Sequence, residues 1–239
     1  PPYSSGTAMP RKPAAPAASN MDREEVLQFF GFVLTHGKPG GRRAAAEALA
    51  EFQGAEADAI AVRTVADEDA QVRAALIPQL RTRKIPNALS LLIRMVDTDD
   101  ENIHEALRKA MPEFSYRQFM TNFDSMPEEL QAIAGNVVRK IDPEVTAKLG
   151  ADINNPSRLC RCRAVLAAGA MGAALDMEPA IIERLSDDDH MVRAAAAQTL
   201  AECRTKPSWE ALRDALFDSS ATVQTVAEES LQRISQSLM

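Results

Sequence analysis

From residue 22 to the end of the chain, apolar side chains recur along helix-length segments at intervals of three and four residues. This spacing places them on one face of a helix with 3.6 residues per turn, which is typical of an amphipathic α-helix. Valine, isoleucine and threonine do not occur in runs that alternate with polar residues, so the pattern gives no sign of a β-sheet. The pattern therefore predicts an all-α protein.

The helical pattern repeats along the chain. With Arg193 in VRAAAAQTL (192–200) as an anchor, six further positions align with it, at steps of 31, 31, 27, 32, 30 and 31 residues. The aligned anchors are Arg42, Arg73, His104, Gln131, Arg163 and Gln224. The residues two, three and seven positions after every anchor are apolar, as is the residue before it except at Gly41. Seven copies in phase predict a repeat protein whose units pack against one another.

A second amphipathic helix precedes each anchored helix, and short polar turns rich in Asp and Ser separate the two. Such side chains accept hydrogen bonds from the free N–H groups at a helix start, and the acids suit its positive dipole end. The sequence thus predicts an α-solenoid, or superhelix, of about seven helix pairs. The expected repeats are 22–54, 55–85, 86–113, 114–142, 143–173, 174–205 and 206–239.

Two segments show the repeat most clearly, AIAVRTVADEDAQVRAALIPQL (59–80) and AIIERLSDDDHMVRAAAAQTLAEC (180–203). They resemble HEAT-like repeats of the short bacterial type, roughly 30 residues long, which are also seen in phycobilin lyase subunits. The resemblance covers about residues 22–237. It implies that the second helices line a concave side, and that the anchor arginine and a turn acid form a ladder between neighbouring repeats.

Matched residue by residue, this ladder comprises Arg42, Arg73, Arg163 and Arg193 with the turn acids Asp67, Asp97, Asp187 and Asp218. His104, Gln131 and Gln224 replace the arginine, and repeats four and five lack the Asp-rich turn. We therefore expect the ladder to be interrupted in the middle of the array.

Composition narrows the choice of partner. Aromatic residues make up only 5% of the chain and alanine fills many apolar positions, which suits close helix packing. The formal charge is −7, and because residues 1–20 hold two bases and no acid, the remainder carries 25 bases and 34 acids, or −9. This balance and the single Trp209 disfavour nucleic-acid binding, which draws its affinity from clustered Lys and Arg.

The first 20 residues contain five prolines among Ser, Gly and Ala, a composition that predicts a disordered linker or tail, with docking on the first repeat as the alternative. Three cysteines form no disulfide framework, which favours a reducing compartment and a cytoplasmic location. No apolar stretch approaches ~18 residues, so we expect no membrane span.

The exposed positions of the second helices are expected one, four, five and eight residues after each anchor. Cations gather in repeats two to five and could form a basic stripe that binds an acidic partner segment. They are Arg81, Arg83, Lys84, Arg108, Lys109, Arg139, Lys140, Arg158 and Arg161. The alternative is that these side chains complement helix dipoles and stay solvated.

The same exposed positions in repeats five and six hold small or adaptable apolar residues that could accept an amphipathic partner helix. They are Ala164, Ala167, Ala168, Met171, Ala194, Ala197 and Ala201. Burial by tight curvature is the open alternative. The aromatic run Phe114, Tyr116, Phe119 and Phe123 in repeat four is expected to form core, because its spacing is that of one helix face.

Cys160, Cys162 and Cys203 and the three histidines show no metal-ligand spacing, and no phosphate loop or nucleophile motif is present. The sequence thus predicts no enzyme, catalytic site or cofactor. Our main hypothesis is a protein-binding scaffold that holds a partner segment, including one from its own parent protein, on its concave face around repeats three to six. The alternative, implied only by the resemblance, is a chaperone or lyase-type subunit acting on a tetrapyrrole-bearing protein.

Overall fold

A computed structural model describes residues 22–237, and within this range the chain forms helices and no strands. The prediction for residues 1–20 lies outside the described range. The α-helices are α1 (Arg23–His36), α2 (Pro39–Leu49), α3 (Ala55–Thr64), α4 (Ala70–Thr82), α5 (Ala88–Ile93), α6 (Glu101–Ala110), α7 (Tyr116–Asn122), α8 (Glu128–Ile141), α9 (Val145–Ile153), α10 (Arg158–Ala170), α11 (Glu178–Glu183), α12 (His190–Leu200), α13 (Lys206–Ala215) and α14 (Ala221–Ser237). Short 3₁₀ turns are η1 (Pro112–Phe114), η2 (Phe123–Ser125) and η3 (Arg184–Ser186).

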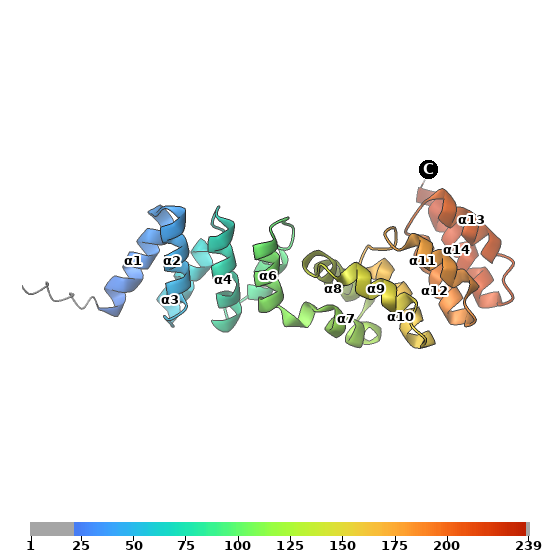
Figure 1. Ribbon diagram of the computed structural model, residues 1–239, viewed down its shortest axis with the longest axis horizontal. Coiled ribbons are helices and arrows are strands. Elements are labelled where there is room, and N and C mark those ends of the chain that lie inside the picture. The colour runs from blue at the N-terminus through green and yellow to red at the C-terminus, as the bar shows by residue number, and fades with distance from the viewer. Residues whose placement is uncertain (1–21, 238–239) are drawn as a thin grey trace, which may run out of the picture.

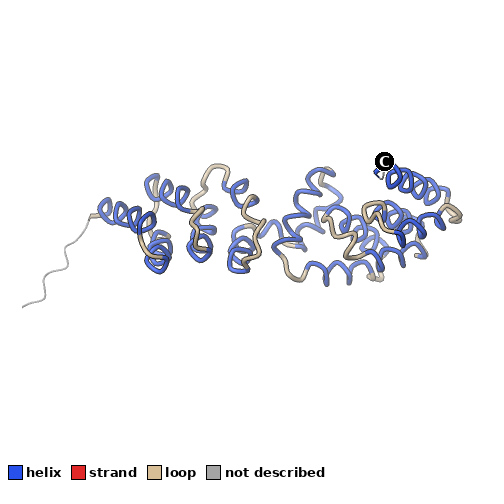
Figure 2. Tube along the Cα trace, turned by 90° about the horizontal axis from the view of Figure 1, so that it is seen from above, coloured by secondary structure: helices blue, strands red, loops and turns tan. Residues whose placement is uncertain are grey.

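These helices form seven consecutive pairs in an elongated row, which is the predicted all-α solenoid (Figure 1). Figure 2 shows the same row from above, with one helix layer beside the other along most of its length. The second helices pack in chain order, α2 on α4 and α4 on α6, then α10 on α12 and α12 on α14. Each pair therefore contacts mainly its sequence neighbours, as in other repeat arrays.

Acidic caps start several second helices, as the turn chemistry predicts. The Asp69 carboxylate accepts the backbone N–H groups of Gln71 and Val72 at the start of α4. Asp100 and Asp189 do the same for α6 and α12. Each cap satisfies N–H groups that have no acceptor within the helix and fixes where the second helix begins.

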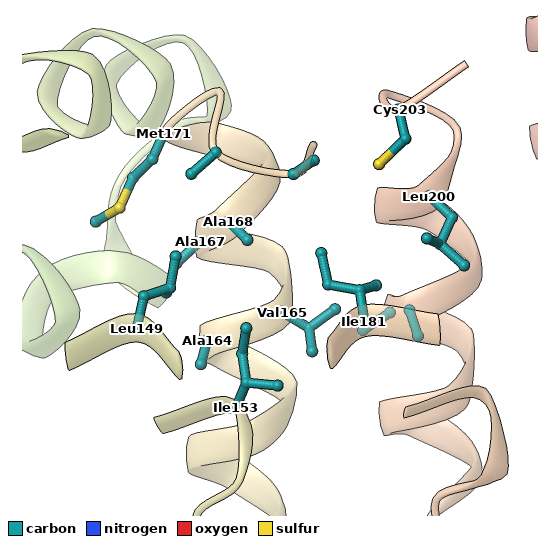
Figure 3. Close-up of a cluster of buried hydrophobic side chains, with 14 of the residues drawn as sticks. Leu149, Ile153, Ala164, Val165, Ala167, Ala168, Met171, Ile181, Leu200 and Cys203 are labelled. Atoms are coloured by element: carbon teal, nitrogen blue, oxygen red, sulfur yellow. The ribbon is translucent and has the colours of Figure 1, made fainter. Parts of the chain in front are cut away.

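The core is divided into two clusters of buried side chains. The first extends from Leu27 to Met111 and adds Val137 and Ile141 of α8, and the second extends from Tyr116 to Ile234. Figure 3 shows part of the second cluster, where Leu149 and Ile153 face the alanines of α10. Phe114, in η1, is half-buried and packs against both clusters. The array is thus two packed stacks that meet in repeat four.

The aromatic run of repeat four belongs to the core, as predicted. Tyr116, Phe119 and Phe123 are buried, and the Phe119 and Phe123 rings pack edge to face with centroids 5.5 Å apart. The Tyr116 hydroxyl donates to Asp152 Oδ2 at 2.8 Å. Burial and this carboxylate raise the pKa of Tyr116 well above its ordinary range, so the phenol stays neutral.

The α6–α8 joint differs from its neighbours, because α8 packs on α6 only through its C-terminal half. Val137 and Ile141 lie in the first core cluster, and Lys140 pairs with Asp97 in the turn before α6. In the N-terminal half of α8, Leu130 and Ile133 are 52% and 51% exposed. The repeat pattern predicts both to be buried, so this part of the expected seam is open.

Candidate functional site

The anchor side chain holds the turn of its own repeat in all seven pairs. In each repeat it lies within hydrogen-bonding distance of a carbonyl oxygen in the turn before the second helix. The pairs are Arg42 with Gly37 (3.0 Å), Arg73 with Asp67 (2.7 Å), His104 with Val96 (3.3 Å), Gln131 with Phe123 (2.9 Å), Arg161 with Asn155 (3.0 Å), Arg193 with Asp187 (2.9 Å) and Gln224 with Asp218 (2.6 Å). His and Gln therefore keep the local role of the arginine that they replace.

The fifth anchor is Arg161 and not Arg163, as the sequence alignment had it. Arg161 bonds the Asn155 and Pro156 carbonyls of its own turn, whereas Arg163 points to the previous repeat, where it bonds Met120 O and pairs with Asp124. The prediction for Arg163 is wrong by two residues. Alanines fill both sides of α10, so its apolar pattern fits either register nearly as well.

Three anchor arginines also cross to the next repeat. Arg42 Nη2 lies 3.0 Å from Asp67 Oδ1. Arg161 donates two hydrogen bonds to Asp187, and Arg193 donates two to Asp218, at 2.7 to 2.9 Å. The hydrogen bonds from these arginines are the main cause that lowers the pKa of Asp187 and of Asp218. Planar two-point pairs of this kind fix orientation as well as distance, so they set the angle between neighbouring repeats.

The ladder is interrupted where the resemblance implies further pairs. Among the described residues, the Arg73 side chain bonds the Asp67 and Glu68 carbonyls of its own turn and no acid of the next repeat. Asp97, its expected partner, pairs instead with Lys140 of repeat four. The prediction of an Arg73–Asp97 pair is therefore wrong, because α8 crosses the end of α6 and brings a nearer cation to Asp97.

Eight of the nine cations of the predicted basic stripe have acidic or carbonyl partners among the described residues, and the exposed Lys84 is the exception. Arg81 pairs with Glu113, Arg108 with Glu101, Lys109 with Glu105 and Arg139 with Asp176, at 2.5 to 2.7 Å. Arg108 and Arg139 also donate to the carbonyls of Ile141 and Gly172, near the C-terminal ends of the next second helices. These contacts are those expected of cations at helix C-termini, and they link repeats three, four and five.

The predicted apolar strip on repeats five and six is not a surface. Ala164 and Ala168 are fully buried and Met171 is 1% exposed, between α9 and the neighbouring second helices (Figure 3). The prediction is wrong because the two-residue shift in α10 moves these residues onto the packed face. Ala194, Ala197 and Ala201 of α12 are buried as well, which answers the open question in favour of burial.

The second helices leave a hollow on their outer side across the first three repeats. It has a volume of about 540 Å³. Its lining comes from α2, α4 and α6 and the residue after α2: Arg43, Glu47, Ala50, Gln71, Ala74, Ala75, Pro78, Gln79, Thr82 and Asn102. Positions one, five and eight after the anchors Arg42 and Arg73 supply half of this lining, whereas positions one and eight are buried in repeat six, at Ala194 and Ala201. Position four is buried in the seam instead, as at Ile77 and Ala197.

The lining of the hollow combines small side chains with amides. Ala74, Ala75 and Pro78 leave room above α4, and Gln71 and Asn102 lie near its rim. Arg43 and Glu47 pair with each other at 2.9 Å, so the hollow carries little net charge. Gln79, at its floor, donates to Ala46 O at 2.7 Å and thereby ties α4 to α2. Sequence reasoning missed this site because no single residue marks it.

Among residues 22–237, no three His, Cys, Asp or Glu side chains lie close enough to hold a metal ion. Burial raises the pKa of the Cys162 and Cys203 thiols, which keeps them protonated. None of the described helices has both the length and the apolar run needed to cross a bilayer.

The match to a family model supports the repeat assignment in the C-terminal part of the chain. The family model for HEAT repeats matches residues 146–232, and a search of curated proteins found no match. Similar solved structures include an engineered protein at 17% identity, which covers 88% of this chain and 96% of its own with a TM-score of 0.39. Human deoxyhypusine hydroxylase in complex with glycerol shows 16% identity over 89% and 97% of the two chains, with a TM-score of 0.35.

A designed armadillo repeat protein shows 15% identity over 87% of this chain and 99% of its own, with a TM-score of 0.31. The seven helix pairs, the anchors that hold their turns and the match to the repeat family agree with one another. The chain is an all-α repeat protein, and its residues 146–232 are similar to the HEAT-repeat family.

Proposed function

We propose that this chain is a non-catalytic scaffold that binds an extended segment of a partner protein in the hollow formed by α2, α4 and α6. The observation that carries the proposal is the hollow itself, about 540 Å³ of open space over three consecutive second helices. Repeat proteins commonly use the surface of successive helices in this way, because it presents the same kind of position several times in a row.

The chemistry of the lining favours an extended polypeptide over a charged ligand. Gln71 Oε1 accepts from Arg43 and Asn102 Nδ2 donates to Asp100, which leaves the Gln71 amide N–H groups and the Asn102 carbonyl to pair with a partner's backbone. The spaces above Ala74 and Ala75 can receive the partner's alternate side chains. Paired charges at Arg43 and Glu47 offer no strong preference for an acidic or a basic segment.

This proposal moves the partner site from repeats three to six, where the sequence suggested it, to repeats one to three. Apart from Lys84, the cations of the basic stripe are engaged within the chain, as Arg81 is with Glu113 and Arg139 with Asp176. The apolar strip at Ala164 and Ala168 is buried. The hollow is a part of the second-helix surface that spans three repeats and offers both space and hydrogen-bonding groups.

The proposal can be tested with peptides selected on the full-length chain from a random phage-display library. Ala74→Trp fills the hollow, and we expect it to weaken binding of a selected peptide at least about tenfold. Ala132→Trp is the matched control, because Ala132 is an exposed alanine on α8 outside the hollow. Equal peptide affinity for both variants would contradict the proposal, since it would place the bound peptide elsewhere.

A further inference from the structure

The N-terminal end of the array exposes an aromatic and apolar surface that no described residue covers. On α1, Phe29 and Phe32 are 54% and 63% exposed. Phe29 lies on the side of α1 opposite Gly31, where an added Cβ would face Ile60 and Arg63 of α3. Phe32 lies a quarter turn from Gly31, at the edge of that side. On α2, Gly41 and Ala44 are exposed and Ala48 is half-buried. We call these five residues the N-terminal face.

The α2 part of this face uses positions that are buried inside the array. Gly41, Ala44 and Ala48 stand one before, two after and six after the anchor Arg42. The residue before the anchor is 0% exposed at Val72, Val192 and Val223, because the previous repeat packs on it. The first repeat therefore presents a complete seam with nothing packed against it in the described part of the chain.

The last second helix, at the opposite end of the array, is polar on its outer side, although Phe217 in the turn before it is 86% exposed. On α14, Glu228 stands four residues after the anchor Gln224, where Ile77 and Ala197 are buried in the seam, and it is exposed, as are its neighbours Thr225, Glu229 and Gln232. A repeat array normally ends in polar outer faces of this kind, because an apolar end would associate. Joining the polar end of one copy to the apolar end of another would bury carboxylates without partners, which disfavours head-to-tail chains.

Charges beside the face favour pairing with its own copy. Two α2 helices that cross antiparallel about a point between Ala44 and Ala45 bring Gly41 of one copy opposite Ala48 of the other. The same two-fold relation brings Lys38 opposite Glu51. Both residues are exposed, and neither forms an ion pair with any residue from 22 to 237. A two-fold interface would thus contain two opposite-charge pairs at its edges.

The small residues of the face permit this close crossing. A Cβ added at Gly40 would meet nothing within 4 Å, and one at Gly41 would only reach Val33 Cγ1 at 3.7 Å. Packing within one chain therefore requires glycine at neither position, and glycine is also a weak helix former. Small side chains are useful where a second helix backbone approaches closely, and the flanking Phe29 and Phe32 supply most of the apolar area.

We propose that two copies of this chain associate through their N-terminal faces in a two-fold dimer, with α2 crossing its counterpart. The joined arrays extend away from each other, so the two polar ends point outward. The hollow over α2, α4 and α6 opens on the second-helix surface, and each dimer would carry two such sites.

Light scattering of the full-length chain across micromolar concentrations tests the dimer. We expect the parent chain to be a dimer. Ala44→Glu should convert it to a folded monomer, by raising the dissociation constant of the dimer at least about tenfold. Ala132→Glu, an equivalent change of an exposed alanine on α8, should leave the dimer intact. A monomeric parent chain would overturn the proposal, as would equal behaviour of the two variants.

Charge exchange tests the two-fold geometry. Lys38→Glu sets like charges against each other and should weaken the dimer, and adding Glu51→Lys should restore it. A photo-crosslinking residue in place of Phe32 separates the possible occupants. Cross-links to α1 or α2 of a second copy support the dimer, whereas cross-links to residues 1–21 of the same chain would show that this segment covers the face and would overturn it.

Discussion

The α10–α12 joint and the α6–α8 joint are built from equivalent positions and pack in opposite ways. Four residues after the anchor, α10 has Val165 and α12 has Ala197, and both are fully buried between neighbouring second helices. At this position α6 has Arg108, whose guanidinium pairs with Glu101 and donates to Ile141 O. Where the seam is apolar the helices lie along each other, and where it holds a cation only the end of α8 makes contact.

This difference shows how one side chain can interrupt a solenoid. A guanidinium is costly to bury without partners, so α8 must leave room for Arg108 and offer it a carbonyl. The C-terminal end of α8 provides that carbonyl, and Leu130 and Ile133 at its other end are left exposed. The two core clusters consequently meet only in repeat four, around Phe114.

Placing a cation in a closed seam should have the largest effect. Ile77 occupies in α4 the position that Arg108 occupies in α6, and it is fully buried. We expect Ile77→Arg to lower the free energy of unfolding by about 4 kcal/mol or more, because the buried charge finds no partner. Urea denaturation measures this, with Ala132→Arg on exposed α8 as the control. A loss below about 1 kcal/mol would show that the seam tolerates charge.

Removing a ladder acid should cost somewhat less. The Asp187 side chain is 2% exposed and holds Arg161, so Asp187→Ala should lower the free energy of unfolding by about 3 kcal/mol. Asp188→Ala, at the exposed neighbouring acid, should change it by less than about 0.5 kcal/mol. A double-mutant cycle should couple Asp187 to Arg161 and not to Arg163. Coupling to Arg163 would restore the register that the sequence suggested.

Truncation of equivalent apolar residues should separate the closed and open joints. Ile103 on α6 and Leu130 on α8 both precede their anchors, but Ile103 is 1% exposed and Leu130 is 52% exposed. Ile103→Ala should lower the free energy of unfolding by about 2 to 3 kcal/mol, and Leu130→Ala by less than about 0.5 kcal/mol. Equal costs in urea denaturation would mean that α8 is packed along its whole length.

Lowering the pH should weaken the ladder pairs of the C-terminal stack, with a smaller loss of stability than the substitutions above. The folded chain holds the pKa of Asp187 and Asp218 below the ordinary value, so the unfolded chain takes up protons first as the pH falls. The stability that these pairs contribute is fully present above about pH 4 and is lost as the pH falls through the folded pKa values. The Asp187→Asn and Asp218→Asn double variant should be less stable at pH 7 and show a flatter profile. An unchanged profile would contradict the role of the ladder.

The sequence predicted the fold because its signal is repeated. The anchors, the apolar rows and the Asp-rich turns appear in several copies, so an irregular copy cannot hide the period. The resemblance predicts two ladder pairs for the same reason, Arg42 with Asp67 and Arg193 with Asp218. The turns that contain Asp67 and Asp218 keep the Asp-rich pattern.

The surface was harder to predict, because it depends on how neighbouring helices meet. In α10, Ala164 and Ala168 look the same in either register, and only the contacts of Arg161 decide between them. At Leu130 the apolar pattern predicts burial, yet the cation at Arg108 in the preceding repeat changes the crossing of α8. Such effects arise between neighbouring repeats, so the pattern of apolar residues within one helix does not show them.

Native-state hydrogen exchange in increasing denaturant tests the division into two stacks most directly. Because the two core clusters meet only in repeat four, we expect the amides of α4 and α6 to lose protection together, and those of α10 and α12 to lose it together at a different denaturant concentration. A single transition shared by all four helices would contradict the account, because it would mean that the α6–α8 joint transmits packing as fully as the others.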